Sequence, residues 1–291
     1  MNKFAYLVLV PLLAVLGFVE VYPLLNTLYL SIIAYGTHPA PYVGLSNYVN
    51  VLEDRNFWSA VSVSFLYAGG STVIAFGIGL LFAFLVSEVK SHGGALEAVF
   101  LTPLAVSPIA VGVLSAPSGF WDDIQTFGHF IFHFPYFNEL SPLFYFPVMI
   151  IAESWEWAPL MMIVFLSVMS SIPKEVGEAA ALHGATAWQK FVRVTIPIIL
   201  KSPVTQFIVV IRFIDAMKAF EIPYAWSAWV GTASIGSPTD TLSLFLYKLI
   251  AFPIYQLPIS YISAVATLLF VVTALSVGIL MRLITRAGAG T

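Results

Sequence analysis

The sequence predicts an all-α membrane protein with six transmembrane helices, on the strength of its composition and its hydropathy. Of its 291 residues, 59% are hydrophobic and only 9% are charged, whereas soluble proteins carry about 25% charged residues. A helix needs about 20 apolar residues to cross the hydrocarbon core of a bilayer, and six stretches of the chain meet that requirement. We therefore expect a single transmembrane domain over residues 1–291.

The expected spans follow one another along the whole chain. The first contains Pro11 and Pro23, which membrane helices tolerate and which usually mark kinks. The second carries small residues that let neighbouring helices approach closely, namely Gly69, Gly70, Gly77 and Gly79. The six expected spans cover residues 4–33, 58–87, 95–116, 144–170, 203–230 and 259–284.

The placement of Lys and Arg predicts the orientation, because cytoplasmic segments carry an excess of these residues. With the N-terminus in the cytoplasm, the two outside positions are Arg55 and Lys248. Both termini are then expected to be cytoplasmic. The eight cytoplasmic positions would be Lys3, Lys90, Lys174, Lys190, Arg193, Lys201, Arg282 and Arg286.

A polar stretch over residues 171–201 interrupts the apolar pattern, and we expect it to form two short helices in the cytoplasm. Pro173 suits the first turn of a helix, and Gly184 can take the left-handed conformation that ends one. Thr186 is then placed to cap a second helix that runs through Arg193. A loop resting on lipid headgroups and a segment that docks into a partner both fit these residues.

Four charged residues recur at intervals of three in the fifth expected span. Consecutive members of such a series have opposite signs and can pair along one helix. An unpaired charge at the centre of the bilayer costs at least about 2.5–3.5 kcal/mol on insertion scales. An internal salt-bridge ladder and the polar lining of a water-filled pathway both explain the series, which comprises Arg212, Asp215, Lys218 and Glu221.

Two carboxylates lie among tryptophans in the fourth expected span, at Glu153, Trp155, Glu156 and Trp157. Aromatic faces pack on the apolar face of a sugar, and carboxylates accept hydrogen bonds from its hydroxyl groups. The alternative is that Glu153 and Glu156 pair with Arg212 or Lys218 and hold the helices together.

The sequence offers little support for catalysis or for cofactor binding. The chain has no cysteine, no phosphate-binding loop and only scattered basic residues, so we expect no bound ATP and no nucleic acid. His129 and His133 have a spacing that can hold a metal, but no ligand motif surrounds them, so we expect no metal site. A membrane enzyme using Glu153 and Glu156 lacks a nucleophile with its base, and we expect no catalytic residue.

The spacing inside the polar stretch resembles the EAA loop of ABC importer permeases, whose pattern is EAA, three residues, G, nine residues, I, one residue, LP. Here Glu178-Ala179-Ala180 is followed after three residues by Gly184 and after nine more by Val194-Thr195-Ile196-Pro197. His183 departs from the Asp that is common before the glycine. The resemblance extends to the sugar branch, and to its maltose-type first permease, through Pro11, Tyr22-Pro23, Gly44 to Tyr48, Phe57-Trp58, Gly79, Pro103, Pro108 and Ser171-Ile172-Pro173.

The resemblance implies a type I ABC importer permease fold, in which the EAA loop is a cytoplasmic coupling hairpin that contacts an ATPase subunit. It also implies that the sugar pathway lies in the spans on either side of that loop. The coupling residues would be Glu178, Ala179, Ala180, His183, Gly184, Phe191 and Pro197. The pathway residues would be Glu153, Trp155, Glu156, Trp157, Val210, Arg212, Phe213, Ile214, Asp215 and Met217.

The same resemblance implies the partners and the location. They are a second homologous permease, two ATP-binding subunits that hold ATP and Mg, an extracytoplasmic solute-binding protein, a sugar-like solute and membrane lipid, in the cytoplasmic membrane of a prokaryote. An ion-coupled secondary transporter that uses the intramembrane charges is the alternative.

Overall fold

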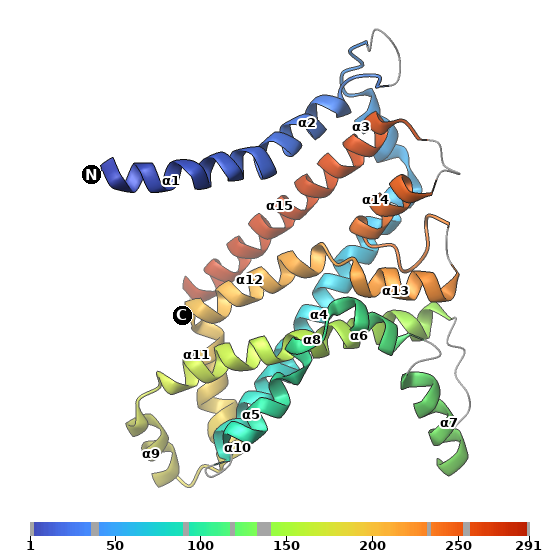
Figure 1. Cartoon of the computed structure of the whole chain (residues 1–291). Coiled ribbons are helices and arrows are strands. Elements are labelled where there is room, and N and C mark those ends of the chain that lie inside the picture. Colours follow the sequence, from blue (N-terminus) through green and yellow to red (C-terminus); the bar gives the residue numbers. More distant parts are fainter. Residues whose placement is uncertain are drawn as a thin grey trace.

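The computed structural model describes residues 3–35, 41–89, 93–116, 120–132, 141–231, 234–252 and 257–289. Across these ranges the chain is helical apart from its connecting turns and one isolated β-bridge between Ile33 and Tyr42. The all-α prediction is therefore confirmed. Figure 1 shows long helices crossing one another as a bundle, with the first helix projecting from it.

The N-terminal helix is continuous but contains one wide turn. Helix α1 (Lys3–Leu16) leads through a π-helical turn (Gly17–Val21) into α2 (Tyr22–Ser31). The N–H of Tyr22 bonds to the carbonyl of Gly17, five residues back, immediately before Pro23. Because proline has no N–H to donate, the backbone widens next to it. Helix α2 packs on the bundle, against α15 (Ile259–Ala289), while α1 projects from it in Figure 1.

The longest helices, α4 (Arg55–Glu88) and α8 (Pro142–Ser170), form the central pair of the bundle. They approach closely because α4 is narrow where they meet. A Cβ atom added at Gly79 would lie 2.5 Å from the Cβ atom of Met161, so only glycine fits there. At Gly70 an added Cβ atom would lie 3.2 Å from the side chain of Ile150, which is a tight contact, whereas Gly69 and Gly77 have open space beside them. Of the four glycines that the sequence analysis singled out, Gly70 and Gly79 therefore lie where α4 approaches α8 closely.

The range 95–116, expected to be one span, is not one straight helix. Helix α5 (Gly93–Leu101) continues into a 3₁₀ turn (Thr102–Ala105), and α6 (Pro108–Ser115) leaves it at an angle of 94°. Residues that precede a proline avoid the helical conformation, and Ser107 is accordingly extended, with a ψ of 138°. In the sequence, Pro103 and Pro108 are the residues that indicate this bend.

The second half of the bundle is also broken into segments. Helix α12 (Pro203–Met217) stops before Lys218, and α13 (Glu221–Val230) continues the expected fifth span. Helix α14 (Leu242–Ala251) and α15 complete the chain. Over the described residues, four helices are long and apolar enough to cross a membrane, and two bent pairs bring the total to as many as six.

Two segments expected to be outside loops contain helices. Helix α3 (Ser46–Glu53) packs on α15 and α4, where Val51 is buried against the ends of those helices. Helix α7 (Phe120–Phe132) lies within the aromatic stretch between the third and fourth spans, at the lower right of Figure 1. A short amphipathic helix has too few apolar residues to be recognised as a span, so hydropathy alone assigned both to loops.

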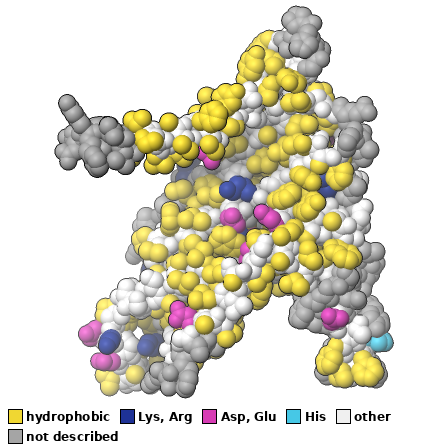
Figure 2. Space-filling model, in the orientation of Figure 1, with side chains coloured by type: hydrophobic (Ala, Val, Ile, Leu, Met, Phe, Trp, Pro, Cys, Tyr) yellow, Lys and Arg dark blue, Asp and Glu magenta, His cyan; other side chains and the backbone are white. Residues whose placement is uncertain are grey.

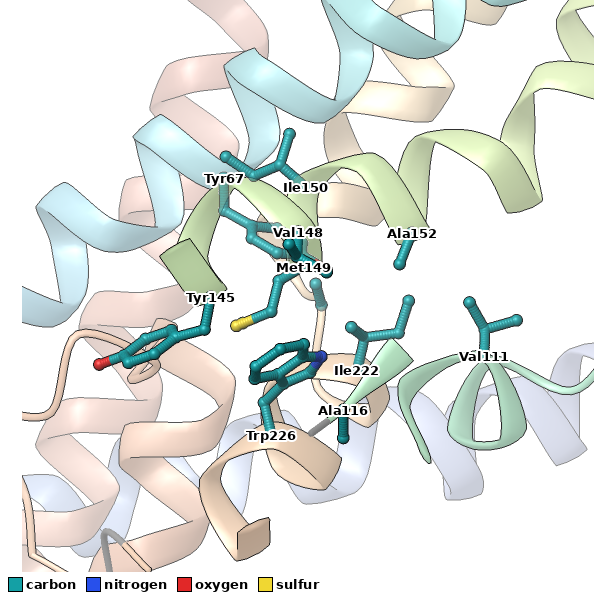
Figure 3. Packing of buried hydrophobic residues seen from close by; sticks show 11 residues of the cluster. Tyr67, Val111, Ala116, Tyr145, Val148, Met149, Ile150, Ala152, Ile222 and Trp226 are labelled. Carbon is teal, nitrogen blue, oxygen red and sulfur yellow. The ribbon is translucent and has the colours of Figure 1, made fainter. Parts of the chain in front are cut away.

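The core at one end of the α4–α8 pair gathers around Trp226 of α13. Its indole is fully buried beneath Met149 and beside Tyr145 of α8, as Figure 3 shows. The indole N–H donates to the Ser115 hydroxyl of α6 at 3.1 Å, which satisfies the polar atom of this large side chain. Helices α6, α8 and α13 are thereby fixed to one another.

Candidate functional site

An ion pair is buried between α8 and α12, in the middle of the bundle. The Nη2 atom of Arg212 lies 3.0 Å from the Oε1 atom of Glu153, and the two side chains are 0% and 7% exposed. The hydroxyl of Tyr67, on α4, donates to the other carboxylate oxygen of Glu153 at 3.1 Å. Three helices that are distant in sequence therefore meet at one carboxylate.

Arg212 makes further contacts that hold its guanidinium group in place. The Nη2 atom donates to the hydroxyl of Ser71 at 2.9 Å, and Nη1 lies 3.4 Å from the Oδ2 atom of Asp215. The guanidinium carbon lies 4.8 Å from the centre of the Trp157 ring, a cation–π distance. The Nε atom has no hydrogen-bond partner in the described part of the chain. Arg212 is thus bound on several sides and retains one donor.

The arrangement supports both interpretations of the charged residues. Glu153 pairs with Arg212 across two helices, as the structural alternative predicted. Asp215 is 47% exposed, so the cluster also reaches an open face of the bundle. Of the expected four-residue ladder, the described residues show the ion pair of Arg212 with Asp215, and Lys218 is the exposed residue that caps α12.

The predicted pathway residues divide into those that lie at the cluster and those that do not. Glu156 is buried one turn from Glu153. Trp155 is 40% exposed and lies on the other side of α8, because residues two apart point in nearly opposite directions on a helix. On α12, Val210 and Met217 are buried and Phe213 and Ile214 are half-buried.

The polar stretch forms the two helical segments that the sequence predicted. Helix α9 (Lys174–Leu182) ends at His183, and Gly184 follows with a φ of +74°. Thr186 caps the next helix through a capping box, in which its hydroxyl accepts from the N–H of Gln189 and the Gln189 side chain accepts from the N–H of Thr186. The helix break at Gly184 and the cap at Thr186 are confirmed.

The second segment does not end at Arg193, as the sequence suggested. Helix α10 (Ala187–Lys190) runs through a π-helical turn (Phe191–Thr195) into α11 (Ile196–Lys201) and bends by 71° where it meets α12. As before Pro23, the wide turn directly precedes a proline, here Pro197. The polar segment and the fifth span are therefore joined by a bent helix.

Most of the predicted coupling residues are exposed. Glu178, Ala179, His183, Gly184 and Pro197 are exposed and Ala180 is half-buried. Phe191 differs from them, because its ring is buried 4.8 Å from that of Phe84 and anchors the segment to α4.

The polar segment also exposes apolar surface. Leu182 is 88% exposed and Trp188 is 55% exposed, although both are large apolar side chains on helices. A groove of about 470 Å³ lies beside α9, lined by Met169, Val176, Glu178 and Lys190 among others. In Figure 2, charged side chains gather around this end of the molecule at the lower left. Apolar side chains exposed among charged ones are typical of a protein-binding surface.

The sequence did not reveal a second buried ion pair, at the other end of α4. The Nζ atom of Lys248 lies 2.6 Å from the Oδ1 atom of Asp240, and each side chain is 1% exposed. The N–H groups of Gly236 and Ser237 donate to the other carboxylate oxygen. Burial raises the pKa of Asp240, and the hydrogen bonds from Lys248 and the two backbone groups oppose that effect. The sequence signal that could have revealed this pair is the single charge within the apolar α14, because such a charge needs a partner when it is buried.

We expect Lys248→Met to lower the free energy of unfolding by about 3–5 kcal/mol, because it leaves a buried carboxylate without its partner. Thermal unfolding of the purified protein, followed by tryptophan fluorescence, measures the effect. The double variant Lys248→Met/Asp240→Asn removes both charges and should recover most of the loss. A single variant as stable as the unchanged protein would contradict this role of the pair.

The fold matches the transmembrane chains of ABC importers. With several helices long and apolar enough to cross a bilayer, the protein is a multi-pass membrane protein. A bacterial ABC transporter involved in the import of the acidic polysaccharide alginate matches with a TM-score of 0.77 and 21% identity, over 97% of this chain and 95% of that one. A bacterial alginate ABC transporter in complex with an alginate pentasaccharide-bound periplasmic protein matches with a TM-score of 0.79 at 20% identity, over 98% of this chain and 95% of that one.

Curated relatives narrow the class to permease subunits. The trehalose/maltose transport system permease protein MalF of Thermococcus litoralis is 28% identical over 288 residues, which cover 95% of this chain and 94% of that protein. The inner membrane ABC transporter permease protein YcjO of Escherichia coli is 28% identical over 84% of this chain and 83% of its own. The trehalose transport system permease protein SugA of Mycobacterium tuberculosis is 25% identical over 81% and 76%. No protein-family model matches the chain.

These similarities confirm the resemblance to sugar permeases of the maltose type. The relatives are permease subunits, which are non-catalytic membrane components of their transporters. The prediction that this chain is not itself an enzyme is confirmed on that ground.

Proposed function

We propose that this chain is the transmembrane subunit of an ATP-driven importer that moves a sugar or related polar solute into a prokaryotic cell by alternating access. The observation that carries the proposal is the similarity to a trehalose/maltose permease over 95% of the chain.

The polar segment is proposed to couple the chain to separate ATPase subunits. Its exposed Leu182 and Trp188 and the groove beside α9 suit a protein partner better than lipid headgroups, since charged residues surround them. Two such subunits, carrying ATP and Mg, would act on this permease and on a second homologous one. The segment and both termini are proposed to face the cytoplasm, because most of the positive residues lie there.

The sugar pathway is proposed to pass the Arg212 cluster. The half-exposed Asp215 carboxylate and the half-buried Trp157 ring beside Arg212 supply a hydrogen-bond acceptor and the apolar face that a sugar needs. An extracytoplasmic solute-binding protein would deliver the sugar from the other side of the membrane, and lipid would surround the spans. The similarity of the fold to an alginate importer crystallised with a periplasmic protein supports such a partner.

An ion-coupled secondary transporter is disfavoured, because Glu153 is already paired with Arg212 and because the relatives are ABC permeases. The two mechanisms differ in their energy source. We expect uptake of radiolabelled maltose or trehalose by cells carrying the complete transporter to require ATP and to persist when a protonophore collapses the proton gradient. Uptake that stops with the gradient while ATP remains would overturn the proposal.

A further inference from the structure

A small cavity lies between α13 and α14, at the end of the bundle away from the polar segment. It has a volume of about 180 Å³. The N–H of Leu242, the first residue of α14, donates to the hydroxyl of Ser64 on α4, whereas the polar segment contacts α4 at Phe84. Those positions are 20 residues apart, which is about 30 Å along a helix. The cavity and the polar segment therefore lie on opposite sides of a bilayer-thick layer.

Aromatic rings form one wall of this cavity. Tyr224 of α13 and Tyr247 of α14 both line it, and their ring centres are 5.4 Å apart in an edge-to-face arrangement. Phe220 stacks on Tyr224 at 5.3 Å and meets Tyr247 at 5.2 Å, so it supports both rings from the side. Both tyrosines remain half-exposed. The two tyrosine rings are therefore held in a fixed orientation, and part of each ring surface faces the cavity.

Polar residues also line the cavity, and the helices that carry them are held in place by hydrogen bonds and an ion pair. Ser227 and Lys248 also line the cavity. The ion pair of Lys248 with Asp240 anchors α14 to the loop that precedes it. The hydroxyl of Thr241 donates to the carbonyl of Ala219 at 2.7 Å, which ties α14 to the break between α12 and α13. Both helices that carry the tyrosines are therefore fixed before a ligand arrives.

We propose that this cavity binds one pyranose unit of the sugar before the sugar reaches the Arg212 cluster. Tyrosine rings pack on the C–H face of a pyranose, and their hydroxyls, which bond to each other in this structure, can also donate to or accept from its hydroxyl groups. At about 180 Å³ the cavity is smaller than the roughly 300–1,000 Å³ of sites for drug-sized ligands, so it suits one ring of a larger saccharide.

The position of the cavity favours a role in entry. Helix α13 follows directly on α12, which carries Arg212 and Asp215. The break between α12 and α13 bonds to the first turn of α14, whose next turn lines the cavity. The carbonyl of Ala219 accepts from the hydroxyl of Thr241, and the carbonyl of Lys218 accepts from the hydroxyl of Ser243 at 3.0 Å. Occupation of the cavity is thereby linked to the end of the helix that lines the proposed pathway. This inference rests on the proposed function, since it names an additional site for the same sugar.

Saturation-transfer NMR on the complete transporter in lipid nanodiscs tests the site, with glucose, maltose and trehalose as probes. Tyr247→Ala should lower saturation transfer to the sugar C–H protons at least about fivefold. Tyr247→Phe keeps the ring and loses one hydroxyl, so it should weaken binding less than Tyr247→Ala does, by about two- to threefold, the lower part of the range for one hydrogen bond. Tyr42→Ala, which removes a tyrosine that is 75% exposed on another segment, should change nothing.

The inference would be overturned by unchanged binding in Tyr247→Ala, or by an equal loss in Tyr42→Ala. It would also fail if none of the three sugars showed saturation transfer although one was taken up. The proposed function fails separately, if uptake of every sugar tested proves independent of ATP. Thermal unfolding followed by tryptophan fluorescence is the control for the fold. An unchanged unfolding temperature in Tyr247→Phe shows that a change in binding does not come from loss of the fold.

Discussion

Arg212→Met is expected to lower ATP-dependent sugar uptake at least about tenfold and to destabilise the bundle. The substitution leaves the Glu153 carboxylate buried with one remaining donor, the hydroxyl of Tyr67. Removing one partner of a buried ion pair costs about 3–5 kcal/mol, because the other charge stays desolvated. Uptake into proteoliposomes holding the complete transporter, together with thermal unfolding, measures both effects.

A double variant separates the structural role of Arg212 from its role in transport. Glu153→Leu/Arg212→Met replaces the pair with apolar side chains, which often restores stability or improves it. We expect this variant to unfold near the temperature of the unchanged protein while its uptake stays low. If uptake returns along with stability, the cluster holds the helices together and the sugar pathway lies elsewhere.

The charge cluster shows where sequence reasoning stops. Charges inside apolar spans indicated that partners must exist, since lone charges are costly in lipid. The sequence could not choose between Arg212 and Lys218 as the partner of Glu153, because the choice depends on where α12 ends. The helix ends at Met217, and in the described part of the chain the carboxylate of Glu153 pairs with Arg212. A helix end without glycine or proline leaves little trace in the sequence.

The same contrast holds for the fold. Hydropathy located the apolar stretches, but it could not show that α5 and α6 meet at 94°. Pro108 marked the position of that bend and left its angle open, because neighbouring helices determine the angle. The Asp240–Lys248 pair was hidden for a different reason, since positive residues in an outside segment are ordinarily expected in water. The polar segment was predicted best, because Gly184 and Thr186 act locally on the backbone.

Gly184→Val is expected to reduce coupling between ATP hydrolysis and uptake at least about tenfold, while the chain still inserts into the membrane. Gly184 has a φ of +74°, a conformation that costs other residues about 1–3 kcal/mol and β-branched residues most. A Cβ atom there would meet no neighbour within 4 Å, so the effect comes from the backbone and not from a clash. Relief of the strain would turn the end of α9, and with it the exposed Leu182.

Gly184→Asn is the matched control, because asparagine tolerates the left-handed conformation far better than valine does. We expect this variant to keep most of its uptake per ATP hydrolysed, measured on the same reconstituted transporter. Size and polarity at this exposed position would then matter less than the backbone angle. Equal losses in both variants would instead indicate that a partner contacts Gly184 directly and leaves no room for a side chain. Normal coupling in Gly184→Val would contradict the assignment of the polar segment to the ATPase interface.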